Sequence, residues 1–233
     1  GCEELPEGQP VLCDVLLEAA DGTQRVLPYP DAELTRLDIN EGSTVTLRDH
    51  RLAKAAHKVY FTRHGETVWN VENKICGMTD SPLTEKGRAQ ARELGEKLRT
   101  SGLRIDEILY SPLSRAADTA RAIAEATGIP ARCEPRLREQ CFGRYEGTPR
   151  DGEEFRISKT HFADRYSGGE SMMQLAQRIY NLLDELRADT DKTYLLVAHN
   201  GIARVVQSYF YDMTNEEYAA AGIKNCEFVE FTF

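Results

Sequence analysis

The segment VYFTRHGETVWN, residues 59–70, bears most directly on the fold of this chain. It opens with the apolar run at 59–62, which predicts a buried strand. A strand that merely turned at the surface would more usually be followed by Asn, Asp, Gly or Pro. Here the run Arg-His-Gly follows at positions 63–65. This end of the strand therefore needs an explanation beyond a turn.

Beyond residue 58 the chain alternates between strand-like and helix-like segments. We predict strands at 59–62, 105–111, 193–198 and 226–233, and helices at 84–100, 112–127, 170–188 and 202–210. Such alternation is typical of an α/β fold, with a largely parallel sheet covered by helices on both faces. Ligands of such sheets bind beyond the carboxyl ends of the strands, so positions 63–65 lie where a site belongs.

The first part of the chain has a different pattern. Residues 11–48 contain strand-like runs, and Asp21-Gly22 between two of them is a strong hairpin signal. We expect a small module of three or four strands over residues 1–57, of unknown role, and a larger domain over 58–233. The stretch 50–58 is predicted to connect them, and packing of the module against the larger domain is favoured over independent binding.

Composition excludes several classes of protein. The chain has 233 residues, 41% hydrophobic and 29% charged, and no apolar run near the ~18 residues of a membrane span. A net charge of −9 argues against nucleic acid as a partner. The six cysteines are scattered singly, which favours incidental thiols in a reducing, cytoplasmic compartment. Because the chain begins without Met, a processed N-terminus is compatible with this expectation, and the oligomeric state stays open.

A second strand end repeats the first. In TYLLVAHNGIARVV, residues 193–206, an apolar strand ends in His199, and a helix follows. Two imidazoles in matching positions indicate a shared site. A metal centre is the alternative, but it needs further ligands in the same place, and His50, His57 and His161 lie in linker-like or polar segments. We therefore expect no metal.

Arginines accompany the histidines. In SPLSRAADTA, residues 111–120, we predict Ser111 as the helix N-cap, Pro112 at the first helical position and Arg115 in the first turn. The Arg115 guanidinium then reaches back over the strand ends. Together with Arg63 and the two imidazoles, it makes a pocket that suits a dianionic phosphoryl group.

These motifs occur in a recognisable order. They are RHGETVWN at 63–70, GMTDSPLTEKGRAQA at 77–91, SPLSRAADTA at 111–120, LREQCFGRYEG at 137–147, GGES at 168–171 and LLVAHNGIARVV at 195–206. The chain from residue 58 to its C-terminus resembles the histidine phosphatase superfamily, also called phosphoglycerate mutase-like. The resemblance does not cover residues 1–57. It implies that 58–233 is a catalytic domain.

The resemblance also implies roles for individual residues. His64 is expected to be the nucleophile that forms a phosphohistidine. The expected phosphoryl-binding residues are Arg63, Asn70, Arg115 and His199. Because His64 must attack as the neutral imidazole, its other nitrogen needs a hydrogen-bond acceptor, and Gly65 lets backbone approach closely enough to supply one.

The catalytic acid is expected to be a glutamate. The resemblance places it at Glu139, which is preferred over Glu146. For Glu66 and Glu170 the choice stays open between orienting roles and helix-start electrostatics. Ser171 and Gln174 are spaced as a capping box, which is a sufficient structural explanation for that loop.

Two positions depart from the family pattern. Cys76 stands where glutamine is common and is expected near the mouth of the site, with incidental packing favoured over a substrate contact. Asn200 stands where glycine is common, and asparagine tolerates unusual turn dihedrals. The segment 150–169 is expected to form part of a lid. Its cations could engage a second negative group, although a solvated face is slightly favoured; they are Arg150, Arg156, Lys159 and Arg165.

The resemblance thus predicts a metal-independent phosphomonoesterase that acts on a small phosphorylated metabolite and needs no cofactor. One alternative is a cofactor-dependent phosphoglycerate mutase, and another is a non-catalytic phospho-ligand binder. Only 60 positions separate Glu139 from His199, whereas the mutases carry a longer insertion there that covers the site. The short spacing therefore favours an open pocket and hydrolysis.

Overall fold

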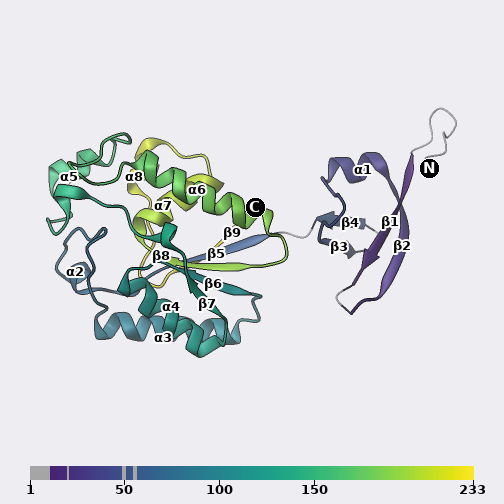
Figure 1. The fold of residues 1–233 in the computed structure, drawn as a ribbon, viewed down its shortest axis with the longest axis horizontal. Coiled ribbons are helices and arrows are strands. Elements are labelled where there is room, and N and C mark those ends of the chain that lie inside the picture. Colours follow the sequence, from purple (N-terminus) through teal and green to yellow (C-terminus); the bar gives the residue numbers. More distant parts are fainter. Residues whose placement is uncertain (1–10, 20, 49–50, 55–56) are drawn as a thin grey trace. The chain divides into compact units, whose positions relative to one another are not determined.

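The computed structural model describes residues 11–19, 21–48, 51–54 and 57–233, so His50 lies outside the described residues. The chain divides into two compact units, residues 1–56 and 57–233 (Figure 1). Each is described by itself below.

The first unit contains the predicted hairpin. Strands β1 (Leu12–Glu18) and β2 (Gln24–Pro30) pair antiparallel over their full length. The turn between them uses Gly22 at φ 81°, a left-handed conformation that favours glycine.

Helix α1 (Asp31–Arg36) and strand β4 (Arg51–Lys54) of this unit differ from the prediction. Helix α1 follows β2 directly and was not predicted. Strands β3 (Val45–Arg48) and β4 form a second antiparallel pair, so the four strands make two separate two-stranded sheets. β4 falls within the stretch 50–58 that was predicted to be a connection. Leu52 is its one apolar side chain of any length, which leaves too weak a pattern for a strand to be recognised.

The second unit is built on a five-stranded sheet in the order β7-β6-β8-β5-β9. Its strands are β5 (Lys58–Arg63), β6 (Glu107–Tyr110), β7 (Ala131–Cys133), β8 (Tyr194–Ala198) and β9 (Phe228–Thr232). The first four run parallel, and β9 pairs antiparallel with β5. The predicted, largely parallel α/β sheet is confirmed. β7 was missed because it is a short strand of exposed residues at the edge.

Helices cover both faces of this sheet, as predicted. α3 (Glu85–Thr100) and α4 (Ser114–Thr127) lie on one face, and α6 (Met172–Ala188) and α7 (Asn200–Phe210) lie on the other (Figure 1). Alternate side chains of the buried strands divide between the two cores: Tyr60 and Leu195 pack with α3 and α4, whereas Phe61 and Leu196 pack with α6 and α7. The alternation follows from the two-residue period of a strand.

Short elements gather where the parallel strands end (Figure 1). They are α2 (Val68–Val71), α5 (Glu153–Ser158) and α8 (Asn215–Ala220), and 3₁₀ turns occupy Pro135–Leu137 and Gly143–Tyr145. None was predicted, because elements of three to six residues are too short to show a helical period. Among the helices in the described parts of the chain, none has both the length and the apolar character that a membrane crossing requires.

Candidate active site

Three strand ends meet at the carboxyl edge of the sheet. In the β5–β8 register Arg63 lies opposite Ala198, and the His64 backbone N–H donates to the Ala198 carbonyl at 3.0 Å. Ser111, which follows β6, donates its backbone N–H to Val197 at 3.0 Å. The imidazoles of His64 and His199 therefore lie together, with 5.2 Å between ring centroids.

His64 is buried and held as a neutral imidazole. Its Nδ1 lies 2.7 Å from the Gly65 carbonyl, which only accepts hydrogen bonds, so Nδ1 carries the hydrogen and Nε2 keeps its lone pair. Burial lowers the pKa of His64 well below the usual value, and the charges of Arg115 and Arg63 lower it further. The acceptor expected from close backbone is thus the carbonyl of Gly65 itself.

His199 is also fully buried. Its Nε2 lies 2.6 Å from the Ser111 hydroxyl, whereas its Nδ1 has no partner among the described residues. Burial lowers the pKa of His199 well below the usual value, with further contributions from Arg115 and His64. Ser111 thus holds this ring with Nδ1 free.

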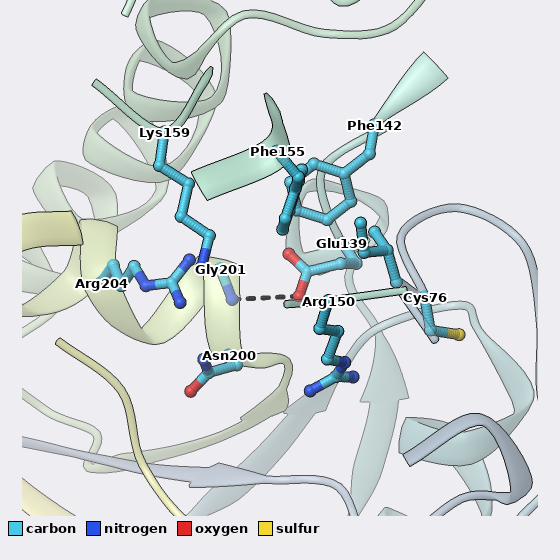
Figure 2. A pocket seen from close by; sticks show the side chains of 10 residues that line it. Cys76, Glu139, Phe142, Arg150, Phe155, Lys159, Asn200, Gly201 and Arg204 are labelled. Atoms are coloured by element: carbon cyan, nitrogen blue, oxygen red, sulfur yellow. Dashed lines mark hydrogen bonds between the residues drawn. The ribbon is translucent and has the colours of Figure 1, made fainter. Parts of the chain in front are cut away.

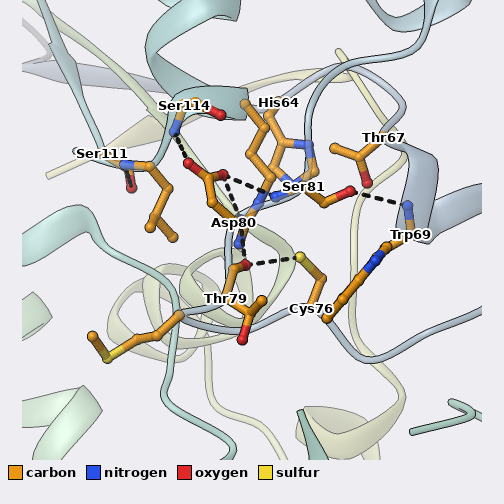
Figure 3. A network of polar contacts seen from close by, with 12 residues as sticks. His64, Thr67, Trp69, Cys76, Thr79, Asp80, Ser81, Ser111 and Ser114 are labelled. Carbon is orange, nitrogen blue, oxygen red and sulfur yellow. Dashed lines mark hydrogen bonds and ion pairs between the residues drawn. The ribbon is translucent and has the colours of Figure 1, made fainter. Parts of the chain in front are cut away.

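This placement corrects the prediction that Ser111 caps the following helix. α4 begins at Ser114, because Leu113 is still extended at ψ 137°. The cap comes from Asp80, whose Oδ2 accepts the Ser114 backbone N–H at 2.8 Å, within the network of polar contacts in Figure 3. Arg115 is consequently the second helical residue.

Arg115 is fully buried and fixed through one end of its guanidinium. One terminal nitrogen donates to the Thr79 carbonyl at 3.0 Å and to Asp80 Oδ1 at 3.3 Å, and the other donates to the Gly77 carbonyl at 2.7 Å. Its Nε has no partner among the described residues. The loop 77–80 therefore fixes the guanidinium and leaves this edge unused.

Arg63 is arranged in the same way. A terminal nitrogen donates to the Ile223 carbonyl at 3.0 Å, and its Nε has no partner among the described residues. Burial lowers the pKa of Arg63 to about 10, and the nearby charge of Arg150 adds to the effect. It is still a cation at neutral pH.

Within the described part of the chain, the buried side-chain nitrogen and oxygen atoms without a hydrogen-bond partner are Arg63 Nε, Arg115 Nε and His199 Nδ1. Leaving a buried polar group unpaired costs roughly 1–3 kcal/mol, so proteins rarely do it without a reason. All three atoms belong to residues that the sequence assigned to phosphoryl binding. Together with the free lone pair of His64 Nε2, they are groups that an anionic ligand would satisfy.

The carboxylate of Glu139 lies against the first turn of α7. Its Oε2 accepts the Gly201 N–H at 3.0 Å (Figure 2). Its Oε1 accepts the Gln140 N–H at 2.9 Å. A Cβ on Gly201 would come within 2.4 Å of Glu139 Oε1, so only glycine allows this approach. The carboxylate is buried and lines a pocket.

Glu146, the rival acid, is occupied by backbone. Its carboxylate accepts four N–H groups, at 2.9–3.2 Å, from Gly77, Met78, Thr79 and Phe142. It therefore holds the loop whose carbonyls fix Arg115. This is a structural task, and it leaves little accepting capacity for substrate.

Asn70 has a structural role as well as a place near the site. Its Oδ1 accepts the Thr67 N–H at 3.1 Å, which completes a capping box at α2, and also accepts from Asn225 Nδ2 at 3.2 Å. The same Asn225 amide donates to the His64 carbonyl at 2.9 Å. Asn70 is thus tied to the backbone that carries His64.

The glutamates left open by the sequence have structural partners. Glu66 accepts from the Thr84 hydroxyl at 3.0 Å and from Lys86 at 2.8 Å, beside the start of α3. Glu170 forms a two-pronged ion pair with Arg178 at 2.8 and 2.9 Å. The predicted capping box of Ser171 and Gln174 at α6 is confirmed.

The side chain of Asn200 has a structural role that the sequence did not predict. It is the first helical residue of α7 and does not have a positive φ. Its Oδ1 accepts the Ile223 N–H at 2.9 Å. It thereby holds the segment whose carbonyl binds Arg63 and which carries Asn225.

Beside the histidines, a pocket opens at the start of α7 (Figure 2). Its lining consists of Ile75, Cys76, Glu139, Phe142, Arg150, Phe155, Lys159, Asn200, Gly201 and Arg204. The expected lid segment thus contributes Arg150 and Lys159, whereas Arg156 and Arg165 are exposed and are not among the lining residues. Cys76 lines the pocket as expected, and its thiol donates to the Thr79 carbonyl at 3.1 Å.

Comparison with known proteins identifies the family. Residues 59–233 match the model of the histidine phosphatase superfamily (branch 1). The chain belongs to the histidine phosphatase superfamily.

Relatives within the superfamily carry different names. "Probable phosphoglycerate mutase GpmB" of Enterobacter sp. (strain 638) is 43% identical over 154 residues, which cover 63% of this chain and 70% of the relative. The solved mycobacterial glucosyl-3-phosphoglycerate phosphatase is 29% identical, with a TM-score of 0.65 over 75% of this chain and 89% of that chain. The α-ribazole phosphatase of Shigella flexneri, 24% identical with a TM-score of 0.63 over 74% of this chain and 89% of that chain, shares the fold.

In this member of the superfamily, the sequence did not point to several supporting residues. They are Asp80, Asn225 and Arg204, and Ser111 was given a different role. Asp80 lies in a quoted motif and could have been considered as a cap, because aspartate is a preferred capping residue. Arg204 lies in the motif at 195–206, but nothing in that motif assigned it to the pocket, and nothing in the local sequence of Asn225 distinguishes it from a solvated polar side chain.

Proposed function

We propose that this chain is a phosphomonoesterase that transfers the phosphoryl group of a small metabolite to His64 and then to water, without a metal or nucleotide cofactor. The observation that carries the proposal is the set of three unpartnered nitrogens, on Arg63, Arg115 and His199, beside a neutral imidazole. The two arginine Nε groups are donors already fixed in place, and His199 Nδ1 becomes a third when its Nε2 accepts from the Ser111 hydroxyl, so these groups meet phosphoryl charge without reorganisation.

In the first step His64 Nε2 attacks phosphorus. A P–N bond forms, and the P–O bond to the leaving group breaks. The Gly65 carbonyl, 2.7 Å from Nδ1, stabilises the positive charge that develops on the ring. Arg63, Arg115 and His199 stabilise the phosphoryl oxygens as charge spreads over them. Asn70 adds a hydrogen bond to the same group.

Glu139 supplies the proton in this proposal. In its acid form it protonates the leaving oxygen, and the resulting carboxylate then takes a proton from the water that attacks the phosphohistidine. Glu139 is favoured over Glu146 because it lines the pocket, whereas the oxygens of Glu146 accept four backbone N–H groups.

Phosphoglycerate mutase is the second candidate, because a relative that is 43% identical carries that name. A mutase must keep water from its phosphoenzyme and return the phosphoryl group to a sugar acid. Hydrolysis is favoured by the 60 positions between Glu139 and His199, which leave no room for the long covering insertion of the mutases. The solved phosphatase that shares this fold also supports it.

The test is phosphate release from a panel of phosphate monoesters, including p-nitrophenyl phosphate and 3-phosphoglycerate, by wild type and His64→Ala in the presence of EDTA. The proposal expects release that needs His64 and ignores the chelator. Interconversion of 3- and 2-phosphoglycerate, dependent on added bisphosphoglycerate and without release, would favour the mutase. Binding without either reaction would make the chain a phospho-ligand binder.

A further inference from the structure

Three cations line the pocket beside the histidines without a negative partner. Arg150 precedes α5, Lys159 follows it, and Arg204 lies on α7; all three are half-buried. None of them forms an ion pair with a described residue. Among the described lining residues the one carboxylate is Glu139, which already accepts two backbone N–H groups. The pocket therefore carries positive charge that the protein does not neutralise.

These side chains are held in place through parts other than their outer charged ends. Arg150 donates its Nε to the Lys74 carbonyl at 2.8 Å, and Arg204 donates its Nε to the Ala221 carbonyl at 2.7 Å. Lys159 places its Nζ over the ring of Phe155, 5.0 Å from the centroid. The guanidinium ends and the ammonium stay available, as Figure 2 shows for Arg204 and Lys159. A ligand would meet donors that are already oriented.

The arrangement is electrostatically costly in the empty protein. Burial lowers the pKa of Lys159 to about 8, and the charges of Arg204 and Arg150 lower it further. Burial also lowers the pKa of Arg150. A bound anion would offset both effects. These three cations lie together without an acidic partner although the chain as a whole has a net charge of −9.

This group of cations is separate from the phosphoryl-binding group. Arg63, His64, Arg115 and His199 are not among the residues that line the pocket. Glu139 belongs to both groups: it lines the pocket, and it is the proposed acid for the phosphoryl group. Arg150 couples the two groups electrostatically, because its charge lowers the pKa of both His64 and Lys159.

We propose that Arg150, Lys159 and Arg204 form a second anion subsite, so that the substrate carries a carboxylate or a second phosphate in addition to the phosphoryl group that His64 accepts. The proposal rests on the proposed function for the identity of the transferred group. The apolar wall of Ile75, Phe142 and Phe155 would pack against the carbon frame between the two anions.

Matched esters test the subsite. 3-Phosphoglycerate and glycerol 3-phosphate differ by a carboxylate in place of a hydroxymethyl group, and fructose 1,6-bisphosphate and fructose 6-phosphate differ by the second phosphate. We expect wild type to prefer the doubly anionic member of at least one pair in kcat/KM by about 10- to 100-fold, the effect of a charge-assisted contact. The preferred pair identifies the second group as carboxylate or phosphate.

Variants then assign the preference to these residues. Lys159→Met should remove most of it, mainly through KM, and should leave p-nitrophenyl phosphate hydrolysis within about twofold of wild type, since that ester has no second anion. Lys159→Arg should keep the preference because it keeps the charge. Arg156→Gln is the matched control, since Arg156 is an exposed cation of α5, the helix that Lys159 follows, and this variant should change the rate with neither ester of a pair.

Two results overturn the subsite while leaving the phosphatase intact: wild type hydrolyses p-nitrophenyl phosphate but prefers no doubly anionic ester, or Lys159→Met lowers both members of a pair equally. If wild type turns over no ester, calorimetry of the same pairs decides. Tighter binding of the doubly anionic member that Lys159→Met abolishes supports the subsite and counts against the phosphatase. Equal binding overturns the subsite.

Discussion

At the scale of single residues, the site depends on keeping two imidazoles uncharged among guanidinium groups. Burial lowers the pKa of both His64 and His199 well below the usual value, and Arg115 lowers both further. In the unfolded chain each returns to about 6.5. Below that pH the unfolded chain binds more protons than the folded protein. The free energy of unfolding therefore keeps its full value above about pH 6.5 and decreases as the pH falls below it.

This difference predicts early acid destabilisation. Between about pH 6.5 and pH 5 each histidine should cost up to about 1.4 kcal/mol of unfolding free energy per pH unit. Denaturant unfolding in phosphate-free buffer measures this slope, and His199→Gln should reduce it by about half, because one of the two buried imidazoles is gone. An unchanged slope in the variant would contradict the account.

Substitution of the two candidate acids, Glu139 and Glu146, should have different effects on rate and on thermal stability. Glu139→Gln should lower kcat for alkyl phosphates at least about tenfold more than for p-nitrophenyl phosphate, whose leaving group needs little protonation. Glu146→Gln should lower Tm and affect all esters alike, because Glu146 accepts four backbone N–H groups. Steady-state rates with both ester types and a melting curve for each variant measure this. An ester-dependent loss in Glu146→Gln would reverse the assignment.

At this scale the sequence predicts the residues that directly follow a strand, and it fails where a role depends on a distant partner. His64 and His199 could be placed side by side because parallel strands end at one edge of a sheet. Ser111 could not be assigned to His199, because that contact depends on α4 beginning at Ser114 under a cap from Asp80. The cap lies 34 positions away from the residue that it caps.

At the scale of elements, the loop after β5 is clamped between two helices. The Gly65 N–H donates to the Thr119 hydroxyl of α4 at 3.1 Å. On the other side the loop meets α3, where a Cβ on Gly87 would come within 2.1 Å of the Glu66 carbonyl, and a Cβ on Gly65 within 2.4 Å of the Gly87 carbonyl. Both contacts are with backbone, so neither can be relieved by a side-chain movement.

Gly87→Ala should therefore displace the loop that carries His64. We expect a loss of about 1–3 kcal/mol of stability from overpacking, together with a fall in kcat. Ala89→Gly is the control: it lies on the exposed side of the same helix and should cost about 1 kcal/mol through helix propensity while leaving kcat unchanged. Equal kcat in both variants and wild type would show that the close approach does not position His64.

Among the elements, length decides what the sequence could predict. The four long helices were found because each spans several helical periods. Helices α2, α5 and α8 and strand β4 are at most six residues long. Their place depends on tertiary contacts, such as the Trp69 N–H bond to the Ser81 hydroxyl at 3.1 Å at the start of α2.

At the scale of the whole molecule, the site is built within one unit. Every hydrogen bond described for the two histidines and the two arginines joins residues of 57–233. The family match covers 59–233 and leaves out the first unit. We propose that residues 58–233 form the catalytic domain and that the N-terminal β module is accessory.

Removal of the module tests this division. A chain of residues 57–233 should fold and should hydrolyse p-nitrophenyl phosphate with a kcat/KM within about threefold of the full chain, because the hydrogen bonds described for the reacting groups all lie within 57–233. Circular dichroism verifies the fold before rates are compared. A folded fragment with strongly reduced activity would give the module a part in the site.

Trapping the phosphoenzyme tests whether His64 is the nucleophile. Wild type and His64→Ala are mixed briefly with excess p-nitrophenyl phosphate, quenched in alkaline detergent, digested, and analysed by peptide mass spectrometry. We expect one phosphate on His64, stable in base and lost in acid as is typical of a P–N bond, and none in the variant. Turnover by wild type without this label, or a label on another residue, would contradict this assignment.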